Sequence, residues 1–271
     1  MPKASPQYRL VIFDAVEDPR ELRDLIRQAT GAHPTDAVQW LARTPGLWPW
    51  PLDKATVTTI LDGLYEHGVA AEARLVDQIP DLSPPRNIHR VACTEEGLRI
   101  EGLRGEPTHW VPWDKVELIC AGRIVAEEAG PGPSPQWPSP VVAGVRALAL
   151  RKPRPLNVRS ARPGREPVAE AIVVREEPRV AFRFVENQMN YAYLGERLRD
   201  AAAENFPLFL SDLLGRSTRA YVADSTRSLM DGREPGEHDF PSPQALLEHA
   251  TMQLLWAWYR RDRKAWDEQG R

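Results

Sequence analysis

Apolar positions in the first 80 residues change their spacing several times, and each change marks a new element. Residues 9–13 form a short apolar run rich in strand formers, and acidic residues with Pro19 end it. Helical spacing follows in residues 19–30, 34–44 and 54–67. Residues 69–76 then supply a returning strand. The pattern predicts a compact module of residues 1–79, built from strands and three helices.

A different pattern begins beyond residues 80–85, a proline-containing stretch that we interpret as a linker. Short apolar runs separated by turn residues predict a meander of strands at 89–93, 98–103, 109–113 and 116–125. Further strand signals lie at 145–150, 170–175 and 179–185, which is consistent with a second sheet closing over the first. The many prolines of residues 127–140 cannot join a ladder, so they predict an exposed insertion.

The last third of the chain returns to helical spacing. Two helices are expected in residues 193–205 and 206–214, and a longer one from Pro243 to Trp266. The apolar face of this last helix consists of Leu247, Thr251, Leu254, Leu255 and Trp258. We therefore predict an α+β protein. Its module of residues 1–79 precedes an antiparallel β domain of residues 86–271, with Pro/Arg-rich insertions and C-terminal helices.

The order of elements in the module resembles that of two known families. The same resemblance is carried by Ala29-Thr30-Gly31, by Asp36-Ala37 and by the helix-Gly-Val-strand pattern of residues 66–76. The families are the C-terminal domain of ribosomal protein L7/L12 and the related fold of ClpS-type adaptors. Both recruit other proteins and catalyse nothing themselves, so the resemblance implies an adaptor. No residue is carried over as a ligand of either family's partners.

The start of the second region has a resemblance of its own. A Gly-Leu strand, a second strand ending at Trp113 and a third over residues 117–122 are similar to the first sheet of bacterial pleckstrin-homology-like domains. The resemblance implies a small antiparallel sheet in this part of the chain.

Composition and charge then narrow the class of protein. The 42% apolar content is ample for proper cores, and a net charge of −3 argues against a dedicated nucleic-acid protein. Neither a basic-then-apolar start nor an apolar run of roughly 18 residues is present, so we expect a cytoplasmic protein without a transmembrane segment. Cys93 and Cys120 have no metal-ligand spacing and lie in strand-like runs, which predicts buried free thiols.

Candidate catalytic residues are few. No nucleotide loop, metal-ligand cluster or nucleophile motif occurs in the sequence. His33 and Asp36 have helical spacing, but a histidine at a helix start is more often a cap than a base. His89 and His109 fall on neighbouring predicted strands, and two histidines without a third ligand make no zinc site. We assign no catalytic residue, no metal ligand and no cofactor.

Two features predict binding instead. An arginine-rich stretch carries seven cations with no acidic residue between them, namely Arg146, Arg151, Lys152, Arg154, Arg159, Arg162 and Arg165. It suits RNA, an acidic surface or an acidic protein tail, and the alternative is a solvated loop. Trp48 and Trp50, in a Trp-Pro-Trp-Pro loop, are predicted to bind a partner. The alternative is that they seal the module against the rest of the chain.

The favoured hypothesis is a non-enzymatic cytoplasmic adaptor that recruits a protein partner of unknown identity through the module. One alternative is an enzyme with an unrecognised pocket between the two units, since ligand sites prefer such interfaces. A second alternative is an anion- or RNA-binding protein that uses the arginine-rich stretch.

Overall fold

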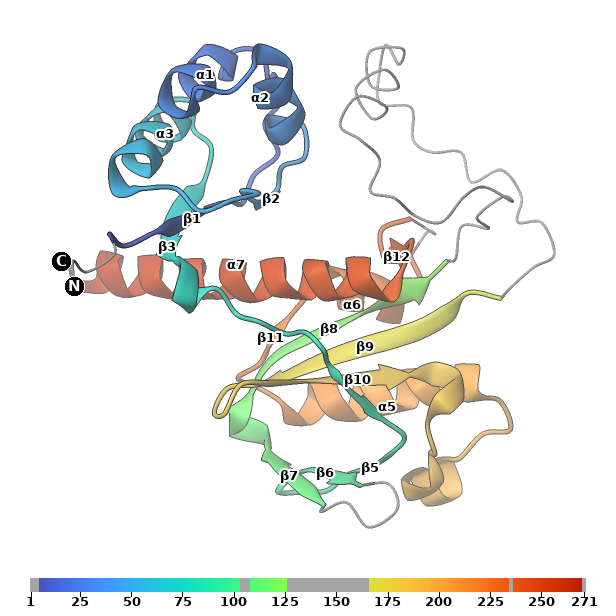
Figure 1. The fold of residues 1–271 in the computed structure, drawn as a ribbon. Coiled ribbons are helices and arrows are strands. Elements are labelled where there is room, and N and C mark those ends of the chain that lie inside the picture. The colour runs from blue at the N-terminus through green and yellow to red at the C-terminus, as the bar shows by residue number, and fades with distance from the viewer. Residues whose placement is uncertain (1–4, 103–107, 126–165, 234–235, 270–271) are drawn as a thin grey trace. The chain divides into compact units, whose positions relative to one another are not determined.

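A computed structural model describes residues 5–102, 108–125, 166–233 and 236–269 of the chain, and Figure 1 shows its fold. Among these residues the chain forms two compact units, one ending at Pro80 and the other beginning at Asp81. Helices occur together with antiparallel and mixed sheets, which confirms the α+β class. None of the described helices is long and apolar enough to cross a membrane.

The first unit consists of a three-stranded sheet with three helices. Its elements are β1 (Tyr8–Ile12), α1 (Arg23–Thr30), α2 (Pro34–Leu41), β2 (Gly46–Leu47), α3 (Lys54–Glu66), β3 (Ala71–Leu75) and the 3-10 turn η1 (Val76–Gln78). The strand order is β2-β1-β3, and both pairings are antiparallel. Figure 1 shows the three helices on one face of this sheet.

Local sequence signals explain two of the helix ends in this unit, whereas α1 begins at Arg23 and not at Pro19 as predicted. Asp53 caps α3, because its Oδ1 accepts the backbone N–H of Thr56 at 3.0 Å. Gly31 closes α1 in the left-handed conformation, with φ of 71°, which glycine adopts without a Cβ penalty. The returning strand is shorter than residues 69–76, since α3 and its turn extend to Gly68.

The core of the first unit lies between its sheet and its helices. Leu10 and Ile12 of β1 point to this side and are buried, and Ile26 and Ile60 meet them from α1 and α3. Alternation along the strand therefore places Leu10 and Ile12 on the side of this core, while Val11, which is also fully buried, points to the other face of the sheet. The full buried set is Leu10, Ile12, Leu22, Ile26, Ala37, Leu41, Trp48, Leu52, Val57, Ile60, Leu64, Val69 and Ala71.

The second unit has a larger and a smaller sheet. Its strands are β4 (Arg86–Ile88), β5 (Arg90–Cys93), β6 (Gly97–Glu101), β7 (His109–Pro112), β8 (Val116–Ile124), β9 (Val168–Arg175), β10 (Val180–Val185), β11 (Tyr221–Val222) and β12 (Asp239–Phe240). Its helices are α5 (Ala202–Arg216), α6 (Asp224–Met230) and α7 (Pro243–Gln269), with 3-10 turns η2 (Trp113–Lys115), η3 (Glu186–Gln188) and η4 (Ala192–Arg197).

Strand pairing in this unit differs from the predicted meander. Strands β5, β6 and β7 form the small sheet, but β8 leaves them and pairs with β9 in the large sheet of order β11-β8-β9-β10-β4, where β12 also pairs with β8. The reason lies in β8 itself, because Leu118 to Ala121 are all fully buried and such a strand needs cover on both faces. The pairings of β4, β11 and β12 are parallel, so the large sheet of the domain predicted as antiparallel is mixed at its edges.

Helices cover the large sheet on both faces (Figure 1). On one face, Phe182 and Phe184 of β10 pack with Phe206 and Phe209 of α5. On the other, α6 and α7 lie along β8. The predicted apolar face of α7 is confirmed, since Leu247, Leu254, Leu255 and Trp258 are all buried.

The single helix predicted over residues 193–205 is wrong. Gly195 has φ of 56° and ψ of −122°, which interrupts the helical turns of η4, and an α-helix starts only at Ala202. That helix runs through Pro207, which has no backbone N–H to donate to the carbonyl of Ala203, so one intrahelical hydrogen bond is absent there.

Candidate functional site

The connection from β2 to α3 bulges away from its neighbour β1. The backbone N–H of Trp48 donates to the carbonyl of Leu10, and that of Leu52 donates to the carbonyl of Tyr8, both at 2.8 Å. Between these two anchors the connection advances four residues while β1 advances only two. Residues 49–51 therefore have no place in the ladder and form the bulge.

The sequence of the bulge explains its shape. Pro49 and Pro51 carry no backbone N–H, so neither can donate to a ladder. Proline also fixes its own φ and restricts the residue before it, which limits the conformations open to Trp50. The two prolines thus hold Trp50 in the middle of a short, stiff loop that is anchored at both ends.

Three indole rings meet at this loop, and we call them the tryptophan cluster: Trp40, Trp48 and Trp50. Their centroids lie 4.4 Å apart for Trp40 and Trp50, 5.3 Å for Trp40 and Trp48, and 5.7 Å for Trp48 and Trp50. All three pairs are edge-to-face, with interplanar angles of 72° to 82°. Each such pair contributes about 0.5–1.5 kcal/mol beyond the burial of its area. The rings therefore restrain one another.

The three rings differ sharply in their accessibility. Trp48 is 2% exposed and belongs to the core of the first unit, whereas Trp50 is 36% exposed and Trp40 is half-buried. Trp48 Nε1 is buried with no hydrogen-bond partner among the described residues. Of the two tryptophans predicted to bind a partner, only Trp50 presents a surface to one, and Trp48 lies beneath it.

The segment that brings Trp40 to the loop is also held in place. Thr44, between α2 and β2, donates its hydroxyl to the carbonyl of Leu41 at 2.8 Å and accepts the backbone N–H of Val16 at 2.9 Å. This one side chain ties the end of α2 to the segment that follows β1. Trp40 thus supports Trp50 from a fixed position.

The arginine-rich stretch has no structural test, because all seven of its cations lie outside the described residues. These are Arg146, Arg151, Lys152, Arg154, Arg159, Arg162 and Arg165. Their binding of an anion stays a prediction.

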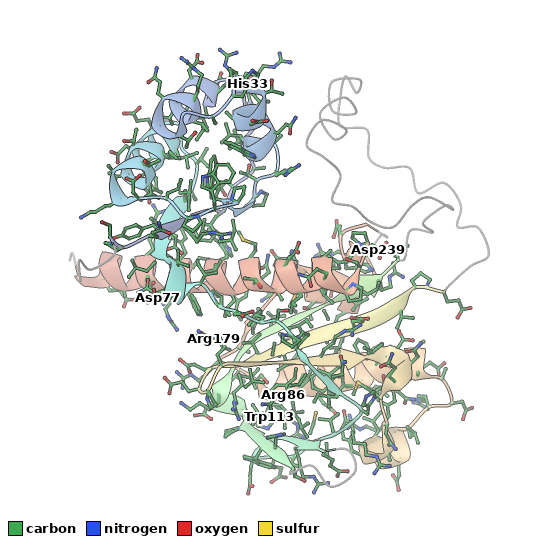
Figure 2. The ribbon with its side chains drawn as sticks, viewed as in Figure 1. His33, Asp77, Arg86, Trp113, Arg179 and Asp239 are labelled. Atoms are coloured by element: carbon green, nitrogen blue, oxygen red, sulfur yellow. The ribbon has the colours of Figure 1, made fainter. Side chains whose placement is uncertain are left out.

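His33, labelled in Figure 2, is a helix cap. Its Nδ1 accepts the backbone N–H of Thr35 at 3.3 Å, at the start of α2. A ring nitrogen used in this way satisfies one of the free donors of the helix terminus. The structure therefore agrees with the structural reading of this residue, and no contact joins it to Asp36.

His89 and His109 each have a separate neighbour. Nδ1 of His89 lies 3.1 Å from the carbonyl oxygen of Gln188, and Nε2 of His109 lies 3.3 Å from Nη1 of Arg86. No group of three or more histidine, cysteine or acidic side chains among the described residues is placed to hold a metal ion. These two histidines thus form no common site with a carboxylate in the described part of the chain.

A polar cluster in the second unit joins η4 to α5. Arg197 makes a two-pronged contact with Asp212, at 2.9 and 2.7 Å, and the Tyr193 hydroxyl donates to Asp212 at 3.1 Å. The hydrogen bond from Arg197 lowers the pKa of Asp212, and burial raises the pKa of Tyr193. Both shifts move the pKa away from neutral pH. Tyr193 and Asp212 are therefore suited to holding the turn in place and not to proton transfer.

Both cysteines are free, and burial raises the pKa of Cys93 and of Cys120 to about 12. The thiolate is the reactive form of cysteine, so both groups are inert near neutral pH. An open hollow beside the start of α5 is lined by Leu198, Arg199, Asp200, Glu204 and Leu208. This lining contains no nucleophile and no histidine.

Comparison with known family models, with curated proteins and with solved structures gave no match. The site is therefore argued from its geometry alone.

Sequence reasoning found the loop but missed Trp40. A signal for it exists, since Ala37 and Leu41 mark the buried face of α2 and Trp40 borders that face at helical spacing. Nothing in the sequence joins α2 to a loop ten residues later, however, and the contact depends on how the helix packs.

Proposed function

We propose that this chain is a non-enzymatic cytoplasmic adaptor that binds a protein partner through the tryptophan cluster of its first unit. The observation that carries the proposal is Trp50, a large aromatic side chain that is 36% exposed yet restrained by two other indoles and two prolines. Tryptophan is enriched among the residues that dominate binding energy at interfaces. A restrained ring loses little further entropy when it is buried, so most of its contact area contributes to affinity.

The resemblance of the module adds support of a different kind. The observed order is strand, two helices, a two-residue strand, a further helix and a returning strand, and apart from the short strand it is the order on which the likeness to L7/L12 C-terminal domains and ClpS-type adaptors rests. Because those families recruit proteins, we extend the likeness to function as a proposal. The likeness of the second unit to pleckstrin-homology-like domains stays a prediction, and the pairing of β8 with β9 gives it no support.

The test compares three forms of the full chain: the natural sequence, Trp50→Ala and Trp110→Ala. Trp110 is 39% exposed on β7 of the second unit, so it is a matched control for the loss of an exposed tryptophan. Proteins captured from nuclease-treated lysate by the natural chain are identified, and their affinities for all three forms are measured by calorimetry. We expect Trp50→Ala to weaken binding by about 2 kcal/mol or more, roughly 30-fold, and Trp110→Ala to leave it unchanged.

Stability must be measured beside affinity. Trp48→Ala removes a buried ring and should cost about 3–5 kcal/mol of unfolding free energy. Trp50→Ala should cost far less, because part of the ring is already in water. A partner that binds the Trp50→Ala form with natural affinity would contradict the proposal, and so would a natural chain that captures no protein.

A further inference from the structure

The small sheet of the second unit has one face that the core does not use. Cross-strand register places Ala92, Arg99 and Trp110 in one row across β5, β6 and β7, and Arg90 opposite Glu101 in the next row. The alternate residues point the other way and are buried in the core, namely Val91, Leu98, Ile100 and Val111. We call the outward side the β5–β7 face and define it by Arg90, Ala92, Arg99, Glu101 and Trp110.

Trp110 is the one large aromatic side chain of this face, and its ring is open. It is 39% exposed, and none of the described aromatic rings or cations stacks on it. Trp113, which lies three residues further along the chain and is labelled in Figure 2, is buried and donates its Nε1–H to the carbonyl of Thr94 at 3.0 Å. Trp50, by contrast, has two indoles against it. Trp110 thus keeps a ring surface available for stacking.

Two arginines share the face with this ring. Arg99 is directly opposite Trp110 on the neighbouring strand, where side chains lie within reach of each other. Arg90 is exposed on β5, with β6 between it and Trp110, whereas Arg86 contacts His109, which alternation places on the opposite side of the small sheet. Glu101 is the one carboxylate of the face, and it lies 3.3 Å from Arg99. The face therefore has two guanidinium groups and one carboxylate.

An exposed ion pair such as Arg99–Glu101 contributes little and exchanges readily with other partners, because water screens both charges. A phosphate with its own negative charge can replace Glu101 as the partner of Arg99. Ala92, beside Arg99 in the row, has too short a side chain to obstruct a planar ligand on the face.

We propose that the β5–β7 face binds single-stranded nucleic acid, with a base stacked on Trp110 and the neighbouring phosphates on Arg99 and Arg90. An aromatic ring on a flat, cationic surface is the arrangement that binds unpaired bases without sequence preference. A duplex offers no free base face, so it gains nothing from Trp110. This surface is separate from the tryptophan cluster and does not depend on the adaptor function.

The test measures the affinity of the full chain for a fluorescein-labelled ten-residue oligouridylate by anisotropy, at low salt. Trp110→Ala should weaken binding about tenfold or more, the usual effect of losing one stacked base, whereas Trp110→Phe should keep most of the affinity. Both changes are at an exposed position, so the melting temperature should stay near its natural value. Trp50→Ala is the matched control, and its affinity should equal that of the natural chain.

Two further variants test the charges. Glu101→Gln should tighten binding at low salt, because it removes the carboxylate that competes with phosphate for Arg99. Arg99→Gln should reduce the slope of log affinity against log salt by somewhat under one. A variant that merely disturbs the fold would not tighten binding.

Two results would overturn the proposal. If the natural chain does not bind the oligonucleotide at low salt, the face is not a nucleic-acid site. If Trp110→Ala binds as tightly as the natural chain, binding belongs elsewhere, with the arginine-rich stretch of residues 146–165 as the next candidate. Binding of a base-paired RNA hairpin as tightly as the single strand would also overturn it, because stacking on Trp110 would then play no part.

Discussion

His238 is buried in the second unit and His249 is half-buried, and each has a buried ring nitrogen with no hydrogen-bond partner among the described residues. His238 precedes β12 in the chain, and the ring of His249 on α7 lies 5.1 Å from that of Phe240. Burial lowers the pKa of both histidines, and Arg123 lowers that of His238 further against the opposing effect of nearby acidic residues. Both are therefore protonated less readily in the folded chain than in the unfolded chain.

The sign of the pH dependence follows from these lowered pKa values. Below about pH 6.5 the unfolded chain binds protons at both histidines that the folded chain does not, so the unfolding free energy falls as the pH falls. Each unit of pKa difference corresponds to about 1.4 kcal/mol. Urea unfolding at pH 7.5, 6.5 and 5.5 should show this loss, and His249→Leu should reduce it. A constant unfolding free energy over this range would show that the histidines can take up protons in place.

The two tryptophans of the loop could be predicted from the sequence, but the difference in their exposure to solvent could not. The Trp-Pro-Trp-Pro motif identified the loop, but it treated Trp48 and Trp50 alike, and the structure buries one and exposes the other. The difference comes from the bulge, where Trp48 still pairs with β1 and Trp50 does not. Trp110 was within reach of sequence reasoning, because alternation from the buried Val111 already places it on the outer face.

At the scale of elements, the packing of β12 on β8 requires a glycine at one position of β8. A Cβ at Gly122 of β8 would lie 2.3 Å from the ring of Phe240 and 2.8 Å from the carbonyl oxygen of His238. Glycine is thus needed there for close approach and not for an unusual φ. An ion pair also joins β8 to β12, because Nε of Arg123 lies 3.1 Å from Oδ1 of Asp239, which is labelled in Figure 2.

Two glycine-to-alanine substitutions should therefore change the unfolding free energy in opposite directions. Gly122→Ala should lower the unfolding free energy by about 1–3 kcal/mol, because Phe240 must move out of a packed position. Gly215→Ala, inside α5 with nothing within 4 Å of the added Cβ, should raise it by about 0.5–1 kcal/mol. Thermal and urea unfolding of the two variants provide the comparison. Equal effects would mean that β12 adjusts without cost.

Elements with a strong local signal were predicted well, and those fixed by tertiary contacts were not. Asp53 and Gly31 mark helix ends that the structure shows at the same residues. Strand β2 is two residues long and exists only because β1 offers it partners, so no local pattern announces it. The same holds for β8, whose apolar run was assigned to the neighbouring meander because sequence order alone suggested that partner.

At the scale of the whole molecule, each unit has its own core. The buried cluster of the first unit consists only of residues between Leu10 and Ala71, and that of the second begins at Ile88. A unit that buries its apolar residues against its own elements meets the usual requirement for folding alone.

Residues 5–80 expressed alone should therefore fold. We expect cooperative urea unfolding and a tryptophan emission maximum to the blue of that of the unfolded piece, because Trp48 stays in the core. Trp48→Ala in this piece should abolish the cooperative transition, since a loss of about 3–5 kcal/mol approaches the whole stability of so small a unit. A piece that unfolds without cooperativity in its natural sequence would contradict this prediction.

The proline-locked loop has a consequence for self-association. Strand β2 is an edge of its sheet, and an edge with free amide donors invites strands from other molecules to add to it. Where β2 would continue outward, Pro49 and Pro51 offer no donors, and the bulge turns the backbone off the line of the ladder. Trp50 is thus exposed at the edge of the sheet, while Pro49 and Pro51 offer an incoming strand none of the hydrogen-bond donors with which aggregation begins.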